Sequence, residues 1–379
     1  MKITFLSFVL FISFFATAQQ LSPVEKKLVQ TVEQQMDQTL QLLRQSVDIN
    51  SGTYNIAGVR AVGELYAKEL RALGFTVEWI LLPDSLKRAG HLVAYRKGIK
   101  GKKLFLIGHL DTVFEPDMPT NPFTLLNDST ATGQGVNDMK GGDVAIIAAL
   151  KAMYQLGLLD QTTITVYMTG DEESAGRPRE VSRGDFITRA QQHDIALAFE
   201  TASGLNTVAT ARRGASGWKL EVEGKQGHSS GVFGNAGYGS IYEAARIINS
   251  FRERLSKEQY LTFNPGLIVG GSEVSYNDEA QQGQVAGKTN IISPRTYANG
   301  DLRFLSEEQK ENARSVMREI VGQSLPGTKA SIRFSDGIPS MPPTEGNTKL
   351  AAQLSEVSEA LGFGKVSPGN PGSRGAGDI

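Results

Sequence analysis

Three apolar runs, each five to seven residues long, constrain the fold of this chain most strongly. They occupy residues 103–108, 163–169 and 195–199, and segments with helical periodicity lie between them. A strand that is apolar at successive positions is buried on both faces, which is typical of a parallel sheet covered by helices. The sequence therefore predicts an α/β fold with a mostly parallel sheet.

A second pattern begins near residue 212. Residues 218–223 alternate between apolar and polar, as a strand with one exposed face does. We predict an inserted α+β lid whose further elements are strands at 266–274 and 296–304 and helices at 238–255 and 306–321. The predicted division is a leader at 1–18, the main domain at 19–211 and 326–379, and the lid at 212–325. In the main domain we expect helices at 24–49, 58–73 and 141–156.

The first 18 residues read as a secretory signal peptide. Lys2 supplies a positive charge, residues 3–15 are almost wholly apolar, and Ala16-Thr17-Ala18 is a small-x-small cleavage site before Gln19. The apolar run is too short to span a bilayer, which argues against the alternative of an uncleaved anchor. We therefore expect a mature protein in the periplasm or outside the cell, with no membrane contact.

Composition excludes several classes of function. The chain has 39 Lys and Arg against 40 Asp and Glu, so no net basic field favours a nucleic-acid partner. It has no Cys, which excludes disulfides, thiolate catalysis and thiolate-ligated metals. Any bound metal is therefore held by His, Asp and Glu.

Acidic and His residues follow the three predicted parallel strands. His109 and Asp111 come after the first, residues 171–173 (Asp-Glu-Glu) after the second, and Glu200 after the third. Ligands of open α/β sheets collect at the carboxyl ends of strands. In His109-x-Asp111 the two side chains share one face of an extended segment, so Asp111 is placed to fix the His109 tautomer.

Each of these residues also has a structural interpretation. A buried neutral His is common, and an Asp-Glu-Glu run is usually a solvated turn. Asp138 precedes the predicted helix at 141–156, where Asp is a favoured N-cap. Together, however, the carboxylates would repel one another without a cation. One His and several carboxylates suit Zn²⁺, with Co²⁺ or Mn²⁺ as alternatives.

Four motifs in one order carry a resemblance to a known family. They are GHLDTV (108–113), GVNDMKGG (135–142), GDEESAG (170–176) and AFET (198–201). The combination resembles the metal-site motifs of secreted zinc carboxypeptidases related to glutamate carboxypeptidase, aminoacylase and acetylornithine deacetylase, across roughly residues 40–379. The resemblance implies two Zn²⁺ per subunit. His109 and Glu200 would bind one ion, Glu173 the other, and Asp138 would bridge both.

The resemblance also assigns residues around the metals. Glu172 would be the general base and Asp111 the partner of His109. In the lid, His228 lies in a Gly-His segment that in the family reaches the scissile carbonyl, often across a homodimer. Asn290 and Arg303 match positions that grip a substrate carboxylate, and the planar fork of Arg suits that group. For Arg303 an exposed strand position is the other interpretation.

The chain departs from the family at its C-terminal end. The family has a final zinc-binding His in a Gly-rich stretch beyond the part that matches residues 373–379, and this sequence has no His after His228. We therefore expect the sequence to be truncated, with the second metal short of one protein ligand. The remaining histidines, His91 and His193, are expected to be structural.

These features predict a di-zinc hydrolase that cleaves an amide bond next to a free carboxylate, as a carboxypeptidase or an N-acyl amino acid deacylase does. The substrate would be a small peptide or an N-acyl amino acid. Two alternatives remain: a dipeptidase or aminopeptidase on the same metals, and a non-catalytic binding or dimerisation protein. Residues 227–231 also satisfy G-x-S-x-G, the nucleophile elbow of serine hydrolases, but that motif needs a buried strand before it and a helix after it.

Overall fold

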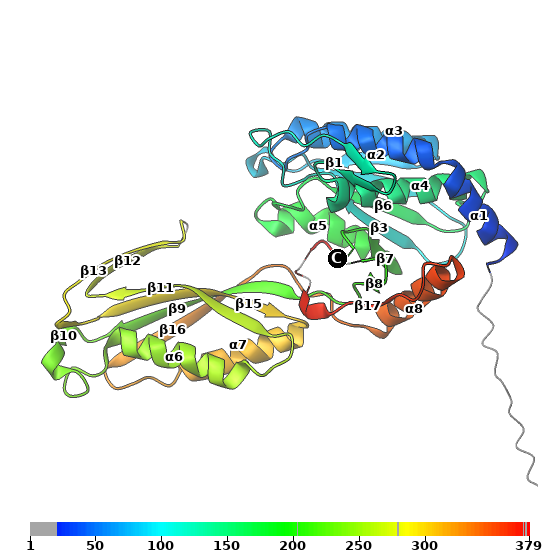
Figure 1. Cartoon of the computed structure of the whole chain (residues 1–379). Helices are drawn as coiled ribbons and strands as arrows, with labels where there is room; N and C mark the ends of the chain where they lie inside the picture. Colours follow the sequence, from blue (N-terminus) through cyan, green and yellow to red (C-terminus); the bar gives the residue numbers. More distant parts are fainter. Residues whose placement is uncertain (1–20, 203, 279, 374, 376) are drawn as a thin grey trace, which may run out of the picture.

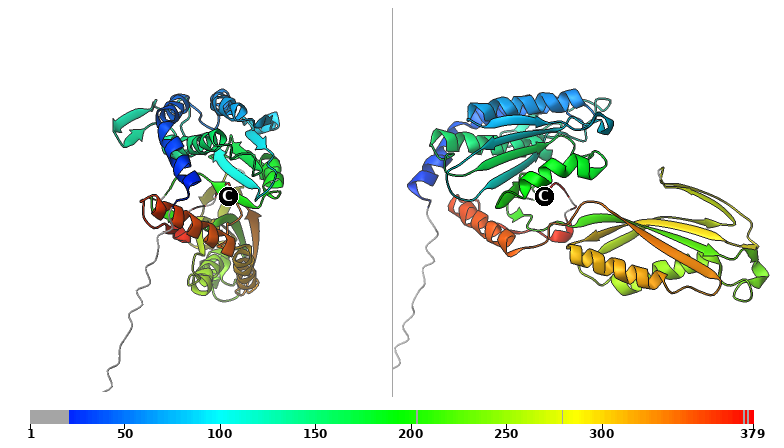
Figure 2. Two further views of the ribbon diagram at one scale, coloured as in Figure 1. Left: turned by 90° about the vertical axis from the view of Figure 1, so that its right-hand side faces the viewer. Right: turned by 180° about the vertical axis from the view of Figure 1, so that it is seen from behind.

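The structure is a computed structural model that describes residues 21–202, 204–278, 280–373, 375 and 377–379. The predicted signal peptide at 1–18 lies outside these residues. The described chain forms two lobes, which are separated along the long direction of the molecule (Figure 1 and Figure 2). We call them the main lobe and the lid.

A five-stranded sheet forms the centre of the main lobe. Its order is β1 (Thr76–Ile80), β2 (His91–Arg96), β6 (Ile164–Thr169), β3 (Leu104–His109) and β7 (Ile195–Ala198). Strands β6, β3 and β7 are parallel, whereas β2 runs antiparallel to both β1 and β6. The predicted α/β class is confirmed, and the sheet is mixed because β2 opposes its neighbours.

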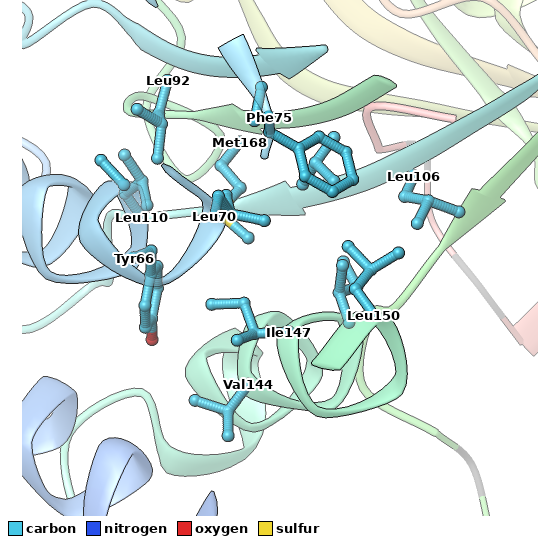
Figure 3. Packing of buried hydrophobic residues seen from close by; sticks show 14 of the residues in the cluster. Tyr66, Leu70, Phe75, Leu92, Leu106, Leu110, Val144, Ile147, Leu150 and Met168 are labelled. Carbon is cyan, nitrogen blue, oxygen red and sulfur yellow. The ribbon is translucent and has the colours of Figure 1, made fainter. Parts of the chain in front are cut away.

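Helices cover both faces of this sheet. On one face, α3 (Ile56–Ala72) and α4 (Gly141–Gln155) pack against the strands, and Figure 3 shows the contact. On the other face lies α5 (Arg179–Ala190), whose Phe186 stacks edge-on against Tyr167 of β6 and Phe105 of β3. Burial on both faces explains why β3 and β6 are continuously apolar, whereas the edge strand β7 is partly exposed, so the burial expected for residues 195–199 is wrong. The first face is built from Tyr66, Leu70, Leu92, Leu106, Val144, Ile147, Leu150 and Met168.

The helix predicted at 24–49 is wrong in one respect, because two helices occupy this range. They are α1 (Pro23–Gln34) and α2 (Met36–Asp48), with Gln35 between them. The break contains no Gly or Pro, so the hydrophobic spacing runs through it without a signal. The other main-lobe elements are α8 (Glu345–Ala360), β4 (Thr124–Asn127), β5 (Thr130–Thr132), β8 (Thr207–Val208), β17 (Ser367–Pro368), the π-helical turn η2 (Val136–Lys140) and the 3₁₀ turns η1 (Asp84–Leu86) and η4 (Pro371–Ser373).

The lid is an antiparallel sheet with two helices on one face. Its strand order is β11 (Thr262–Gly271), β15 (Arg295–Phe304), β9 (Gly214–Gly224) and β16 (Thr328–Asp336), and its helices are α6 (Gly239–Leu255) and α7 (Glu307–Val321). Alternate residues of β9 are buried, as its sequence pattern predicts. Strand β16 pairs with β9, so the sheet continues beyond residue 325, the predicted end of the lid.

Two short features complete the lid. The hairpin of β12 (Glu273–Asn277) and β13 (Gln282–Ala286) is held to the sheet by Tyr276, whose ring stacks on Tyr297 at 5.6 Å. At the end of the lid remote from the main lobe, β10 (Gly227–His228) pairs with β14 (Ile291–Ile292) (Figure 1 and Figure 2). The 3₁₀ turn η3 (Ser229–Gly231) follows β10 directly.

The chain crosses between the lobes twice, and the two crossings pair with each other. The backbone N–H of Arg212 donates to the carbonyl of Met341 at 2.9 Å, and the N–H of Met341 donates back to Arg212 at 3.0 Å. Strand β9 begins just after the first crossing, and β16 ends just before the second. The lid is therefore joined to the main lobe through a paired connector.

Candidate metal centre

The parallel strands of the main lobe deliver the predicted site residues to one edge of the sheet. His109 is the last residue of β3 and pairs in register with Thr169, the last residue of β6. Glu200 lies two residues beyond the end of β7, and Asp171 two residues beyond the end of β6. Because these strands run in the same direction, their carboxyl ends meet as expected.

His109 presents one ring nitrogen to two carboxylates. Its Nδ1 lies 3.0 Å from the backbone carbonyl of Asp111, and a carbonyl only accepts, so Nδ1 carries the proton of the neutral ring. Its Nε2 then faces Asp138 Oδ1 at 3.1 Å and Glu200 Oε1 at 3.4 Å. The ligand atoms of these three residues lie within 4.8 Å of one another. The structure thus brings together three of the four predicted metal ligands.

The electrostatics of this cluster favour a positive charge at its centre. Burial lowers the pKa of His109, but hydrogen bonds to Asp138 and Glu200 outweigh burial and raise that pKa well above its usual value. The ring is 1% exposed, so water screens little on the side of the imidazole, whereas the Asp138 side chain is 54% exposed. One imidazole nitrogen and two carboxylate oxygens are a donor set that suits Zn²⁺, so the residues present fit a metal ion.

Asp138 is not an N-cap in this structure. The N-cap position of α4 is occupied by Lys140, and Asp138 lies earlier, in the π-helical turn η2, with non-helical backbone angles. Its side chain is half exposed and directed at His109 Nε2. The capping interpretation is therefore wrong, because the turn before α4 carries Asp138 away from the helix end and toward the strand ends.

Asp111 has more contacts than its predicted role requires. Its backbone carbonyl fixes the ring of His109, and its carboxylate lies 3.6 Å from Nδ1. The same carboxylate accepts the backbone N–H groups of Glu172 at 3.0 Å and Glu173 at 3.2 Å, and the hydroxyl of Thr53 at 2.6 Å. The side chain is fully buried, and burial raises its pKa. Asp111 therefore joins the His109 strand to the Glu172 loop.

Glu172 and Glu173 are partly buried on that loop. Burial raises the pKa of each to about 7, and the negative charge of Glu200 adds to the effect in both. Asp138 also raises the pKa of Glu173, so the two carboxylates are electrostatically coupled. Within the described residues, however, Glu173 does not belong to the group that meets at His109. Its role as a ligand of a second metal stays a prediction.

The three lid residues lie at opposite ends of the lid. His228 and Asn290 are close together, because the N–H of Ser229 donates to the carbonyl of Asn290 at 2.9 Å. They belong to the end remote from the main lobe (Figure 1). Arg303 lies near the other end of β15, where its Nε donates to Asp301 at 3.0 Å. Within one chain, Arg303 therefore does not meet His228 and Asn290, and these two lie away from the main lobe that carries His109.

The nucleophile elbow has no structural support. The residue pair before Ser229 forms only the short strand β10, and the 3₁₀ turn η3 follows it instead of an α-helix. The N–H of Ser230 donates to Nδ1 of His228 at 3.2 Å, so this segment is an exposed turn organised around His228. The serine-hydrolase interpretation is wrong because, in the described residues around Ser229, the preceding strand is not buried and no α-helix follows directly.

Comparisons with known proteins agree with this architecture. A family model described as a peptidase dimerisation domain matches residues 210–329. Carboxypeptidase G2 of Pseudomonas sp. is 28% identical over 353 residues, which cover 91% of this chain and 77% of that protein. An aminopeptidase from Bacillus cereus superposes with a TM-score of 0.68 at 18% identity, over 90% of this chain and 86% of the other. A dinuclear metal-binding peptidase of the M20 family from Bacillus subtilis gives 0.58 at 15%, over 91% and 85%.

The chain has the M20 peptidase fold. Its main lobe corresponds to the catalytic domain of that fold and its lid to the inserted dimerisation domain, and the M20 relatives support a hydrolytic enzyme. The expected architecture, a sheet domain with an inserted α+β unit, is thereby confirmed.

One buried charged residue beside the candidate metal centre, Arg183, was not predicted. Arg183 on α5 is 6% exposed, and its guanidinium contacts the carboxylates of both Asp171 and Asp378. Because Arg is mostly exposed in proteins, an Arg within a predicted helix is expected on its solvated face, and the sequence gives little indication that Arg183 is buried. The one available signal is its place in the inward stripe of α5, beside Ser182 and three residues before Phe186.

The histidines expected to be structural are bonded within the main lobe. His91 Nε2 donates to the carbonyl of Ser182 at 2.8 Å, and its Nδ1 accepts the N–H of Gly170 at 3.2 Å. His193 contacts the hydroxyl of Thr165 and the carbonyl of Arg189. Neither ring belongs to the metal-binding group found among the described residues.

We predict that His109→Asn weakens zinc binding by more than about 100-fold. Removing even a residue that only hydrogen-bonds a metal ligand lowers metal affinity by roughly 10–100-fold. Competition titration with a chelating dye measures the affinity. His193→Asn is the matched control, because it removes an imidazole from the same lobe outside the cluster, and it should bind zinc like the wild type. Equal zinc affinity in both variants would remove His109 from the site.

Proposed function

We propose that this protein is a metal-dependent amidohydrolase that cleaves an amide bond next to a free carboxylate. The observation that carries the proposal is the convergence of His109, Asp138 and Glu200 at the carboxyl ends of parallel strands. The similarity to carboxypeptidase G2 supports the choice of reaction. A small peptide or an N-acyl amino acid is the proposed substrate class.

We infer a pair of Zn²⁺ ions per subunit, with Co²⁺ or Mn²⁺ as alternatives. His109, Asp138 and Glu200 would hold one ion, and Asp138 and Glu173 would contribute to the other. Bound divalent metals supply a Lewis acid for the scissile carbonyl and lower the pKa of water. The M20 neighbour from Bacillus subtilis is described as dinuclear, which supports the number of ions proposed.

Glu172 is the proposed general base. Burial raises its pKa to about 7, near which a carboxylate exchanges protons efficiently at neutral pH. Its backbone N–H is held by Asp111, which fixes the point from which its side chain extends. In the proposed reaction the Glu172 carboxylate takes a proton from the attacking water and delivers it to the leaving nitrogen.

The lid residues enter the proposal through a second copy of the chain. His228 lies at the remote end of its own lid, so we propose that it serves the centre of a partner subunit, with Asn290 beside it. Its Nδ1 accepts from Ser230, which leaves Nε2 as the protonated nitrogen of a neutral ring. A donor of this kind suits an oxygen that gains negative charge during the reaction. Arg303 is the proposed partner of the substrate carboxylate.

Substrate preference separates this proposal from its alternatives. We expect N-acyl amino acids to be hydrolysed, and the corresponding dipeptides with a free α-amine to be poor substrates, because the proposed contacts recognise a carboxylate and none recognises an amine. Liquid chromatography of the released amino acid, with zinc supplied, measures both. The reverse preference would indicate a dipeptidase or aminopeptidase. Zinc-replete protein that cleaves neither would support a non-catalytic binding protein.

We predict that Glu172→Gln retains zinc and loses roughly 10²–10⁴-fold in kcat, because general acid–base catalysis contributes a factor of that size. The amide keeps the shape of the carboxylate and removes its capacity to accept a proton. Steady-state kinetics and metal analysis by mass spectrometry measure the two effects. Glu180→Gln, on the exposed side of the same lobe, is the control and should match the wild type. Normal turnover in Glu172→Gln would reject this base.

An exposed aromatic patch on the lid supports a homodimer. It consists of Phe233, Tyr238 and Tyr242, and the ring of Phe233 contacts both tyrosines at 5.1–5.2 Å. Phe233 is 56% and Tyr242 53% exposed. Clustered exposed aromatic rings mark interaction surfaces, and the matching family model is a dimerisation domain. We propose that this aromatic patch contributes to the contact between two lids.

The expected result of Tyr242→Glu is a shift from dimer to monomer, because the carboxylate would be desolvated at a closed contact. Light scattering coupled to size-exclusion chromatography measures the mass. Tyr154→Glu is the control: that side chain is 46% exposed on the main lobe and should leave the mass unchanged. A dimer that survives Tyr242→Glu at micromolar concentration would place the subunit contact elsewhere.

We propose that the mature protein acts in the periplasm or outside the cell after cleavage before Gln19. The support is the charged, apolar and small-residue order of residues 2–18. Among the residues that the structure describes, no helix has the length and apolarity needed to cross a membrane.

A further inference from the structure

Arg183 occupies the centre of a buried polar network behind the candidate metal centre. Its Nε donates to Asp378 Oδ1 at 2.8 Å, and its Nη1 donates to Asp171 Oδ1. Its Nη2 also donates to the backbone carbonyl of Asp171 at 3.2 Å. One guanidinium therefore joins two carboxylates that lie 207 positions apart in the sequence. Only a planar fork with several N–H donors makes these contacts together.

Both carboxylates accept further hydrogen bonds from groups other than Arg183. Asp171 Oδ2 accepts the N–H of Gly176 at 2.8 Å and the hydroxyl of Ser182 at 2.7 Å. Asp378 Oδ2 accepts the hydroxyl of Thr169 at 3.0 Å. Every carboxylate oxygen of the pair thus has a partner, which is the condition under which buried charges are held in one arrangement. Asp171 is fully buried, and the side chain of Asp378 is 15% exposed.

The charges around Arg183 favour the ionised pair. Burial alone raises the pKa of Asp171, but the adjacent Arg183 guanidinium lowers it, and the net pKa lies below its ordinary value. Burial lowers the pKa of His91, which keeps that neighbouring ring neutral. The Arg183 guanidinium therefore stabilises the charged form of the Asp171 carboxylate.

This network holds one side of the loop that carries Glu172. Asp171 precedes Glu172 directly, and Gly176 closes the loop on the carboxylate of Asp171. On the other side, Asp111 holds the backbone N–H groups of Glu172 and Glu173. The loop is thus fixed from two directions, by Asp111 on the strand side and by Arg183 on the α5 side. An error of about 1 Å in the position of a catalytic group costs roughly 100-fold in rate.

The segment that carries Asp378 also reaches the connector between the lobes. Arg212 Nε donates to the carbonyl of Gly375 at 2.7 Å. A Cβ at Gly377 would lie 2.6 Å from the guanidinium of Arg212, so the backbone of residue 377 lies directly against that side chain. The segment is therefore in contact with Arg212 at one point and Arg183 at another.

We propose that Arg183 is a positioning residue for hydrolysis: by binding Asp171 and Asp378 together, it fixes the loop that presents Glu172. The inference rests on the proposed function for the role of Glu172. It assigns Arg183 no contact with the substrate or the metal, and it makes Asp378 its partner in the same task.

The test compares Arg183→Lys with Arg189→Lys in the full chain. Lys keeps the positive charge but cannot contact both carboxylates with the same geometry. Arg189 is the matched control, because it lies on the same helix and also contacts two carboxylates, those of Asp185 and Glu78, away from the loop. We expect Arg183→Lys to lower kcat at least tenfold while KM and zinc affinity stay within threefold, and Arg189→Lys to change none of them beyond twofold.

Hydrogen exchange gives a readout that does not depend on turnover. In Arg183→Lys the backbone amides of Glu172, Glu173 and Gly176 should exchange at least tenfold faster than in the wild type, and in Arg189→Lys at the wild-type rate. If the wild type hydrolyses no amide substrate, the proposed function fails, and this exchange measurement still decides the positioning role. Unchanged exchange and unchanged kcat in Arg183→Lys would overturn it, and so would an equal loss of zinc affinity and kcat.

A double-mutant cycle tests whether Arg183 and Asp378 position the Glu172 loop through their mutual contact. Asp378→Asn removes the negative charge and keeps the shape of the side chain. If Arg183 and Asp378 act through one contact, the double variant should lose little more kcat than the worse single variant. Independent losses that multiply would overturn the pairing of these two residues.

Discussion

Negative charge gathered around a single imidazole is the constraint on which the rest of this structure depends. Asp138 and Glu200 face the same nitrogen of His109, and Glu172 and Glu173 lie on the adjoining loop. Such a group is unstable in a poorly solvated site unless something positive lies within it. The pKa of His109 is raised because its hydrogen bonds to the two carboxylates outweigh the effect of burial. The site therefore favours a positive charge at its centre. A bound cation meets the same demand and leaves the ring neutral.

The scaffold around the centre is made of buried polar groups that hold backbone as well as side chains. Asp111 contributes its carbonyl to His109 and its carboxylate to the next loop, so one residue sets the relative position of two strand ends. Arg183 does the same for that loop from the opposite side. Each contact removes freedom from a group that must be correctly placed before a substrate arrives. The apolar sheet forms a rigid scaffold, and these few polar residues hold the site groups in a fixed orientation on it.

Much of the fold follows from residue patterns, and the exceptions have physical reasons. The runs at 104–109 and 164–169 are buried on both faces, and the end of each run marks where the site lies. The break at Gln35 carries no helix-breaking residue, so periodicity could not locate it. His109, Asp138 and Glu200 were found because their motifs occur in a specific order. Arg183 was missed because its environment depends on residues distant in sequence, above all Asp378.

The antiparallel bridge between Arg212 and Met341 has a mechanical consequence. A single strand of connecting chain permits twist about its own axis, whereas two strands bonded side by side resist twist and bend most easily about one line. Strands β9 and β16 leave this bridge as bonded neighbours, so the paired connector continues directly into the lid sheet. Any rotation of the lid about this bridge would therefore move its remote end, which carries β10, farther than the rest of the lid sheet.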